Sequence, residues 1–432
     1  RDGNRLLDAF AGLYCVNIGY GRQEVSQAIA AQADVWHQTE QKEKAYGYLN
    51  DAITSYPHPQ LYVGLALMHL RDRQADQAEA AYRQALELQP DFVRANLQLA
   101  KLLQLKGQYA ETILLLERVL KKTPQNADAL FLQGVAYFWG EADFVKSAHF
   151  FALALYYKND IKEGCWYLIE SMRNIQLTIF APHYAKAVEI CMNNPNVSKQ
   201  HLGSHWLYLL KCHPDLSQLQ ALLHAPDESA FMALMDGLEG RAMELTDSFW
   251  LSGLARLIVP SPEFEDFTAR LRRYLLANRH LIAQNDWLSL LVALAHQHFL
   301  VEYIAETTES EAAQLIELEA EITAESPVED IILLGCYQRV FRHELAEKWE
   351  ARLRKSEDAD IQSFCQFQLT EPLEEQRILP TIESLGETTD LVSQAVQSQY
   401  EENPYPRWQS ATKLTPRRLD VVAKGMFPFL DS

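Results

Sequence analysis

Residues 79–90 (EAAYRQALELQP) and 114–124 (LLLERVLKKTP) are two amphipathic stretches, and each ends in a proline. The two prolines, Pro90 and Pro124, lie 34 residues apart. Proline cannot continue the hydrogen-bond ladder of a helix and restricts the residue before it, so both stretches predict helices that stop at their prolines. A spacing of this length is typical of a repeated pair of helices.

Alignment on these prolines brings other positions into register. An alanine or glycine recurs in the first helix of each pair, at Ala66, Ala100 and Gly134. Small residues let two antiparallel helices approach closely, and a large residue opposite fills the remaining space. The repeats span about residues 59–92, 93–126 and 127–160. The matched positions of the second helix are Ala78, Tyr82 and Ala85 in the first repeat, Leu116 and Val119 in the second, and Ser147, Phe151 and Ala154 in the third. In the third repeat the register slips by one residue.

This pattern resembles the tetratricopeptide repeat family over roughly residues 40–160; the alternative is a set of unrelated amphipathic helices. The resemblance implies a solenoid whose concave face is lined by the first helix of each pair. The expected partner-binding residues on that face are Arg94, Leu97, Lys101, Phe131 and Phe138. The two cations beside aromatic rings would suit an acidic or amphipathic peptide. In the alternative interpretation, Phe131 and Phe138 are simply part of the core.

Charge and cysteine content limit the expected partners and compartment. The 432 residues carry a net charge of −19, and an acidic chain repels phosphate backbones, so we expect no nucleic-acid partner. Six cysteines without a CxxC pair indicate a reduced, cytoplasmic protein. The longest apolar stretch, residues 287–301, is too short and too polar to span a membrane. The basic cluster of Arg270, Arg272 and Arg273 is interpreted as a solvated helix face.

Residues 161–390 keep a helical pattern but lose the 34-residue repeat. Pro195, Pro260 and Pro327 predict loops between helical hairpins. The chain contains no GxSxG, P-loop or HExxH motif, so we expect neither a catalytic residue nor a metal site. One loose cluster of titratable residues is interpreted as structural: His296, His298 and Glu302.

A distinctive string, YEENPYPRW, occupies residues 400–408. Its two X-Pro steps force an extended path after a helix. The string resembles the junction in bacterial tetratricopeptide-repeat proteins that carry a class I S-adenosylmethionine-dependent methyltransferase domain. That resemblance implies that these residues either flank a substrate pocket in a complete protein or pack as a linker: Tyr400, Asn403, Tyr405, Arg407 and Trp408. No glycine-rich turn follows within the 432 residues, so we expect S-adenosylmethionine to bind only where the catalytic domain is present.

The first residues have a different character. Residues 1–34, RDGNRLLDAFAGLYCVNIGYGRQEVSQAIAAQAD, predict two short strands, a Gly-Tyr-Gly turn and one helix. They closely resemble the N-terminal stretch of class III, pyridoxal-phosphate-dependent omega-amino-acid aminotransferases, in which Tyr14 would match a substrate-pocket aromatic. The motifs around a Schiff-base lysine and a phosphate cup do not follow, so we expect no pyridoxal phosphate. The pattern indicates a fusion or chimera joined near residues 33–36.

Together these features predict an all-α fold with a short α/β stub at residues 1–35. A repeat solenoid at 40–160, a helical array at 161–390 and a helix with the proline-rich junction at 391–432 would follow. The first functional hypothesis is a scaffold whose groove binds a peptide or partner protein, with no membrane contact, no cofactor and no metal. The second is the substrate-recruiting or regulatory half of a methyltransferase whose catalytic domain this chain does not contain. The third is an aminotransferase fragment.

Overall fold

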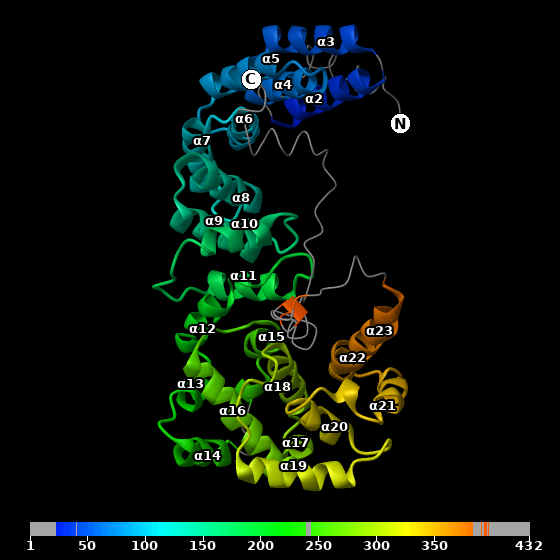
Figure 1. Ribbon diagram of the computed structural model, residues 1–432. Coiled ribbons are helices and arrows are strands. Elements are labelled where there is room, and N and C mark those ends of the chain that lie inside the picture. Colours follow the sequence, from blue (N-terminus) through cyan, green and yellow to red (C-terminus); the bar gives the residue numbers. More distant parts are fainter. Residues whose placement is uncertain are drawn as a thin grey trace. The chain divides into compact units, whose positions relative to one another are not determined.

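The computed structural model describes residues 23–39, 41–238, 243–382 and the single positions 390, 393, 394 and 396. Over these residues the chain is all-α and contains no β-strand, which confirms the predicted fold class. The strands expected in the N-terminal stub fall outside the described residues. The chain forms two compact units, residues 1–175 and 176–432 (Figure 1).

The first unit is a succession of antiparallel helix pairs. The pairs are α2 with α3, α4 with α5, α6 with α7, and α8 with α9, and α10 packs on α9. The predicted succession of pairs is therefore confirmed, and the unit continues through α10, past residue 160. Its helices are α2 Gln23–Gln38, α3 Lys42–Ser55, α4 Pro59–Arg71, α5 Ala75–Leu88, α6 Val93–Leu105, α7 Tyr109–Lys122, α8 Ala127–Ala136, the π-helix η1 Tyr137–Glu141, α9 Phe144–Tyr157 and α10 Gly164–Met172.

Small residues lie where the paired helices cross, as the repeat pattern predicts. Ala66, Ala100 and Gly134 are all buried. A methyl group added at Gly134 would lie 2.7 Å from the ring of Phe151, closer than carbon atoms approach. The aromatic ring therefore fills the space that the glycine leaves open.

The π-helix η1 explains the one-residue slip in the third repeat. It follows α8 directly, and the next residue, Ala142, has a left-handed φ of 52°. A π-turn closes its hydrogen bond one residue later than an α-turn and so accommodates one extra residue. Ser147, Phe151 and Ala154, one residue beyond strict 34-residue spacing, are each fully buried. The extra residue thus lets α9 bury the same face as α5 and α7.

Helix α2 packs as part of the first pair, although its sequence belongs mostly to the predicted stub. It runs without interruption across residue 35 and across the expected join at 33–36. A methyl group added at Gly64 of α4 would lie 2.9 Å from Cβ of Ala30, so α2 and α4 are in close contact. The buried core of this pair contains Ile29, Ala33, Ala45, Leu49, Ala52, Leu61 and Met68.

A polar cluster at the end of α4 also joins α2, α3 and α4. The Asp72 carboxylate is hydrogen-bonded to Nε2 of His37 at 3.0 Å and accepts from the hydroxyl of Tyr46 at 3.0 Å. It also pairs with the ammonium group of Lys42. The hydrogen bonds from Lys42 and then His37 hold the pKa of Asp72 well below its usual range. The carboxylate is therefore charged, and it ties three helices together.

The second unit is built around α18, which is buried from Leu290 to Leu300 on every side. Helices α15, α20 and α22 pack against it. A helix that is buried on every side forms part of a core. In the described part of the chain, no helix is long and apolar enough to cross a membrane. The elements of this unit are α11 Pro182–Asn193, α12 Gly203–Lys211, α13 Ser217–Leu223, α14 Glu228–Asp236, η2 Met243–Thr246, α15 Ser248–Arg256, α16 Pro262–Ala277, α17 Arg279–Gln284, α18 Leu288–Leu300, α19 Glu309–Glu321, α20 Val328–Gly335, η3 Val340–Arg342, α21 Ala346–Leu353, α22 Ala359–Cys365, the π-helix η4 Gln366–Thr370, α23 Glu371–Ile378 and η5 Leu379–Thr381.

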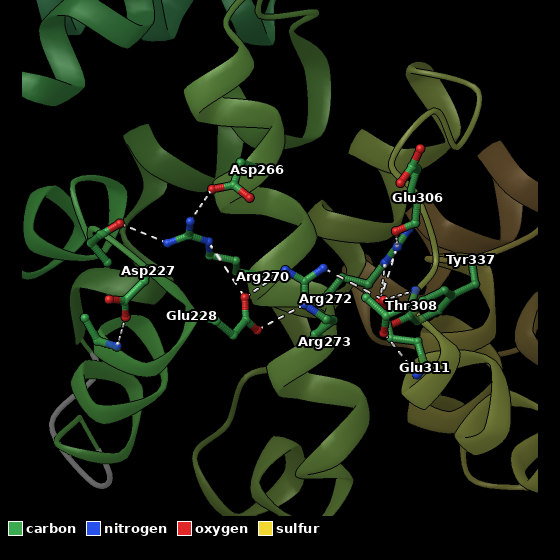
Figure 2. Close-up of polar contacts among 12 residues, drawn as sticks. Asp227, Glu228, Asp266, Arg270, Arg272, Arg273, Glu306, Thr308, Glu311 and Tyr337 are labelled. Carbon is green, nitrogen blue, oxygen red and sulfur yellow. Dashed lines mark hydrogen bonds and ion pairs between the residues drawn. The ribbon is translucent and has the colours of Figure 1, made fainter.

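The arginine cluster of α16 is not a solvated face, so that interpretation is wrong. Arg272 is only 1% exposed, and its guanidinium group lies 3.2 Å from the Glu311 carboxylate (Figure 2). Arg273 and Arg270 both pair with Glu228, at 2.8 Å and 3.8 Å. Arg270 also pairs with Asp266 of the same helix at 2.6 Å. The carboxylates that pair with Arg272 and Arg273 come from α14 and α19, far away in the sequence, which is why the local pattern on α16 suggested unpaired charge.

Candidate interaction site on the repeat unit

Helix α6 carries three of the predicted groove residues at helical spacing: Arg94, Leu97 and Lys101. Arg94 is exposed, whereas Leu97 is half-buried against the repeat core. The Lys101 ammonium group lies 3.8 Å from the carboxylate of Asp128 at the start of α8, so its charge is partly neutralised within the unit. In the part of the chain that the structure describes, Arg94 has no carboxylate partner. Of the two predicted groove cations, Arg94 is therefore the one that remains open to a ligand.

Phe131 and Phe138 are brought together through Tyr167 of α10. The centroid of the tyrosine ring lies 5.6 Å from the centroids of both phenylalanine rings. Phe131 also packs against the buried ring of Phe151 at 5.5 Å. Both phenylalanines are half-buried, so each has one side in the aromatic packing and one side accessible.

Two exposed tryptophans extend this group of rings. Trp139 is 56% exposed and Trp166 is 40% exposed. The Trp139 ring lies 5.0 Å from Phe138, and the Trp166 ring lies 4.9 Å from Tyr167. The indole N–H of Trp139 donates to the Tyr167 hydroxyl at 3.4 Å. We call Phe138, Trp139, Trp166 and Tyr167 the aromatic ledge.

Sequence reasoning missed both tryptophans, although they are the most exposed rings of the ledge. Trp139 lies in the π-turn, where the 34-residue register slips, and Trp166 lies beyond the expected end of the repeats at residue 160. The signal was the density of aromatic letters in 137–139 (YFW) and 166–167 (WY). Local aromatic content was therefore a better guide here than repeat position.

The cations and the ledge are separate features of the same unit. The described residues whose cations stack over aromatic rings are Lys44, Lys146, Arg272 and Arg342, and neither Arg94 nor Lys101 is among them. Arg94 instead lies near the buried Tyr82, whose pKa is raised to about 12 by burial and is lowered in part by the arginine charge. Tyr82 is therefore neutral, and no tyrosinate opposes an acidic ligand at Arg94.

The remaining predicted positions are either outside the described residues or paired within the fold. Tyr14 and the junction residues lie outside the described residues, so their roles stay predictions: Tyr400, Asn403, Tyr405, Arg407 and Trp408. Glu302, expected to cluster with two histidines, lies beyond the end of α18 and pairs with Arg339 at 2.6 Å. Within the described ranges, no three His, Cys, Asp or Glu side chains gather closely enough to hold a metal ion.

Comparison with known proteins identifies the repeat type. Residues 69–134, which run from the last turns of α4 into α8, match the tetratricopeptide repeat family. The described residues are thus an all-α helical array that contains tetratricopeptide repeats. Repeats of this kind generally mediate contacts between proteins through extended surfaces. The chain therefore has the framework of a protein-interaction scaffold.

Short matches also connect the chain with aminotransferases. It is 71% identical over 31 residues to an uncharacterized aminotransferase, y4uB, of Sinorhizobium fredii, and 67% identical over 33 residues to a diaminobutyrate–2-oxoglutarate transaminase of Halomonas elongata. A putrescine–pyruvate aminotransferase of Pseudomonas aeruginosa is 61% identical over 31 residues. Each match covers 7–8% of this chain and 7% of the relative. These matches of 31 to 33 residues are about as long as residues 1–34, the N-terminal segment that resembles this family.

Proposed function

We propose that the repeat unit binds an amphipathic peptide segment of a partner protein. The aromatic ledge receives the apolar side chains of that segment, and Arg94 pairs with an acidic residue. The observation that carries the proposal is the exposure of Trp139 and Trp166 above a layer of half-buried rings. Large aromatic side chains that are rigidly supported and open to solvent are the residues that most often dominate binding energy at interfaces.

The charges on α6 support the proposal that the ligand contains an acidic residue. Arg94 is exposed and has no carboxylate partner in the described part of the chain, so a ligand carboxylate would pair with it without displacing another group. Lys101 already has Asp128 as a neighbour at 3.8 Å and contributes less. Arginine also binds carboxylates with two parallel hydrogen bonds, which adds orientation to the attraction.

Selection from a library of displayed random peptides against the full chain tests this function. Enriched peptides should combine apolar side chains with an acidic residue. Replacing both Trp139 and Trp166 by alanine should weaken their binding by about tenfold or more, and Arg94→Gln should weaken binding of the acidic peptides only. Leu114→Ala is the matched control, because Leu114 is an exposed apolar residue on α7, the second helix of its pair. Equal binding to the double variant and to the unaltered chain would remove the ledge from the proposal.

The resemblance of residues 400–408 to a methyltransferase junction supports a second candidate function. In this version, the repeats recruit a substrate protein for an S-adenosylmethionine-dependent catalytic domain. Isothermal titration of this chain alone should then show no binding of S-adenosylmethionine or of pyridoxal phosphate at concentrations of tens of micromolar. A one-to-one isotherm with either compound would show that this chain holds a cofactor site of its own.

A further inference from the structure

The second unit contains a cavity of about 540 Å³ between α15, α18 and the α22–η4 segment. This volume lies in the range of pockets that hold small molecules in proteins. Its apolar wall includes Leu251, Val292 and Phe367. The remaining wall is polar, and its composition indicates what the cavity binds.

Two cations that form no ion pair among the described residues line the cavity. Arg256 is the last residue of α15, and Lys199 comes from the loop before α12. Both side chains are half-buried, and in the described ranges neither has an ion-pair partner. Burial lowers the pKa of both groups, and the charge of Arg256 lowers the pKa of Lys199 further. The two cations therefore repel each other at a site where water screens them poorly.

Among the described residues that line this cavity, Asp360 is the only carboxylate, and it accepts a hydrogen bond from the Ser289 hydroxyl. It raises the pKa of Arg256 from a distance but forms no ion pair with it. One carboxylate against two cations leaves an excess of positive charge. In a chain with a net charge of −19, such a local excess is unusual.

His296 adds an incompletely satisfied polar group to the same wall. It is 5% exposed, its Nε2 lies 3.2 Å from the Ser363 hydroxyl, and its ring packs edge-on against Phe367. Nδ1 has no hydrogen-bond partner in the described part of the chain. Burial, and then the charge of Arg256, lower the pKa of His296 to about 3, so the ring is neutral. A buried polar atom without a partner is costly unless a ligand or water completes it.

We infer that this cavity binds a small organic molecule carrying a phosphate group. Arg256 and Lys199 hold the phosphate oxygens, the Ser252 and Ser363 hydroxyls donate further hydrogen bonds, and Val292 and Phe367 contact the organic part. A phosphate monoester carries a charge of about −1.5 to −2 at neutral pH, which matches two cations better than a single carboxylate does. The planar guanidinium group of Arg256 suits phosphate oxygens in particular.

Isothermal titration of the full chain with phenyl phosphate tests the assignment, because this probe joins a phosphate to an aromatic ring. Benzoate, benzyl alcohol and inorganic phosphate are the comparison ligands. Phenyl phosphate should bind most tightly, inorganic phosphate should compete with it, and benzyl alcohol should not bind. Arg256→Gln and Lys199→Gln should each weaken binding by about tenfold to a hundredfold, whereas Lys355→Gln, at an exposed position elsewhere in the unit, should leave it unchanged. Equal binding of benzoate would reassign the site to carboxylates, and equal binding of benzyl alcohol would make it an apolar pocket.

Thermal unfolding separates a binding role from a structural one. If the two cations are present for a ligand, Arg256→Gln should raise or preserve the melting temperature of the ligand-free chain, because it removes an unpaired, partly buried charge. Phosphate should also protect Lys199 from acetylation by acetic anhydride, as read by mass spectrometry, and should not protect Lys355. A lower melting temperature in Arg256→Gln, or acetylation of Lys199 that phosphate leaves unchanged, would overturn the inference.

Discussion

Ala85 shows how tightly single residues determine the helix packing of the repeat unit. It is fully buried in the core shared by α4 to α8. Ala85→Arg would force a long charged side chain into this core, and overpacking together with charge burial should cost several kcal/mol of unfolding free energy. Gln84→Arg is the control, because Gln84 is the exposed neighbour on the same helix. Urea denaturation of both variants measures the difference, and equal midpoints would mean that Ala85 lies at no helix interface.

Glu311 is the residue on which the second unit's buried charges converge. It lies in the first turn of α19, accepts from the Tyr337 hydroxyl at 2.9 Å and pairs with Arg272 at 3.2 Å. Burial by itself would raise its pKa, but the hydrogen bonds from Thr308 and Tyr337 and the Arg272 charge outweigh burial and lower it. A carboxylate with a lowered pKa contributes stability above the pKa of the unfolded chain, near 4.3, and loses it as the pH falls through the folded value.

Glu311→Gln should therefore destabilise the chain at neutral pH by about 3 kcal/mol or more, because Arg272 remains buried without its counter-ion. The difference between the variant and the unaltered chain should shrink as the pH falls below about 4. Chemical denaturation at a series of pH values measures both effects. Glu309→Gln changes an exposed carboxylate in the same helical turn and should have little effect. A pH-independent difference would assign the loss to packing instead of charge.

Among the elements, η1 shows what periodicity can and cannot predict. The sequence predicted α8, α9 and even the one-residue slip between them, because buried positions such as Ala66, Ala100 and Gly134 recur at fixed spacing. It could not predict that a π-turn absorbs the slip, since π-turns have no propensity signature of their own. Nor could it predict that Trp139 and Trp166 would join one group of rings through Tyr167, because that arrangement depends on α10 packing on α9 after the repeat has ended.

Deleting Glu141, the exposed last residue of η1, should convert the π-turn into an α-turn and leave the buried face of α9 in place. Deleting Gln84 inside α5 removes a residue from a regular helix instead. It should rotate the last residues of α5 by about 100° and turn Ala85, which is buried in the core, away from its packing partners. The first deletion should lower the melting temperature much less than the second, as circular dichroism can measure. Equal losses would show that η1 is required in itself.

For the whole molecule, the sequence predicted the fold class and the succession of helix pairs but drew its boundaries from local patterns. The compact unit that contains the repeats extends to residue 175, beyond the expected end of the repeat pattern at residue 160, and α10 packs on α9 within it. The joining of α2 to the repeats was also not visible, because residues 23–34 resemble another family while their apolar side chains pack on α3 and α4. Residues 23–34 therefore resemble one family in sequence but pack as part of the repeat unit in this chain.

Deletion of the N-terminal segment distinguishes two descriptions of α2. In one, α2 is a graft that packs poorly; in the other, it is an integral part of the first helix pair. A graft that packs poorly predicts that deletion of residues 1–34 leaves the melting temperature nearly unchanged. The structure favours the opposite result, because this deletion removes Ile29, Ala30 and Ala33 from the first pair and uncovers Leu49 and Leu61. Loss of that burial should cost several kcal/mol.

Deletion of residues 1–22 is the matched control, because it leaves the whole of α2 in place. The longer deletion should lower the melting temperature of the repeat unit by many degrees relative to this control. Gly64→Leu should reproduce part of the loss in the intact chain, because its side chain would collide with Ala30 across the α2–α4 contact. If both deletions melt alike and Gly64→Leu is silent, α2 contributes nothing to the repeats and the graft is the correct description. If only the longer deletion is unstable, α2 is the capping helix that covers the exposed apolar face of the first repeat, as a solenoid requires at its ends.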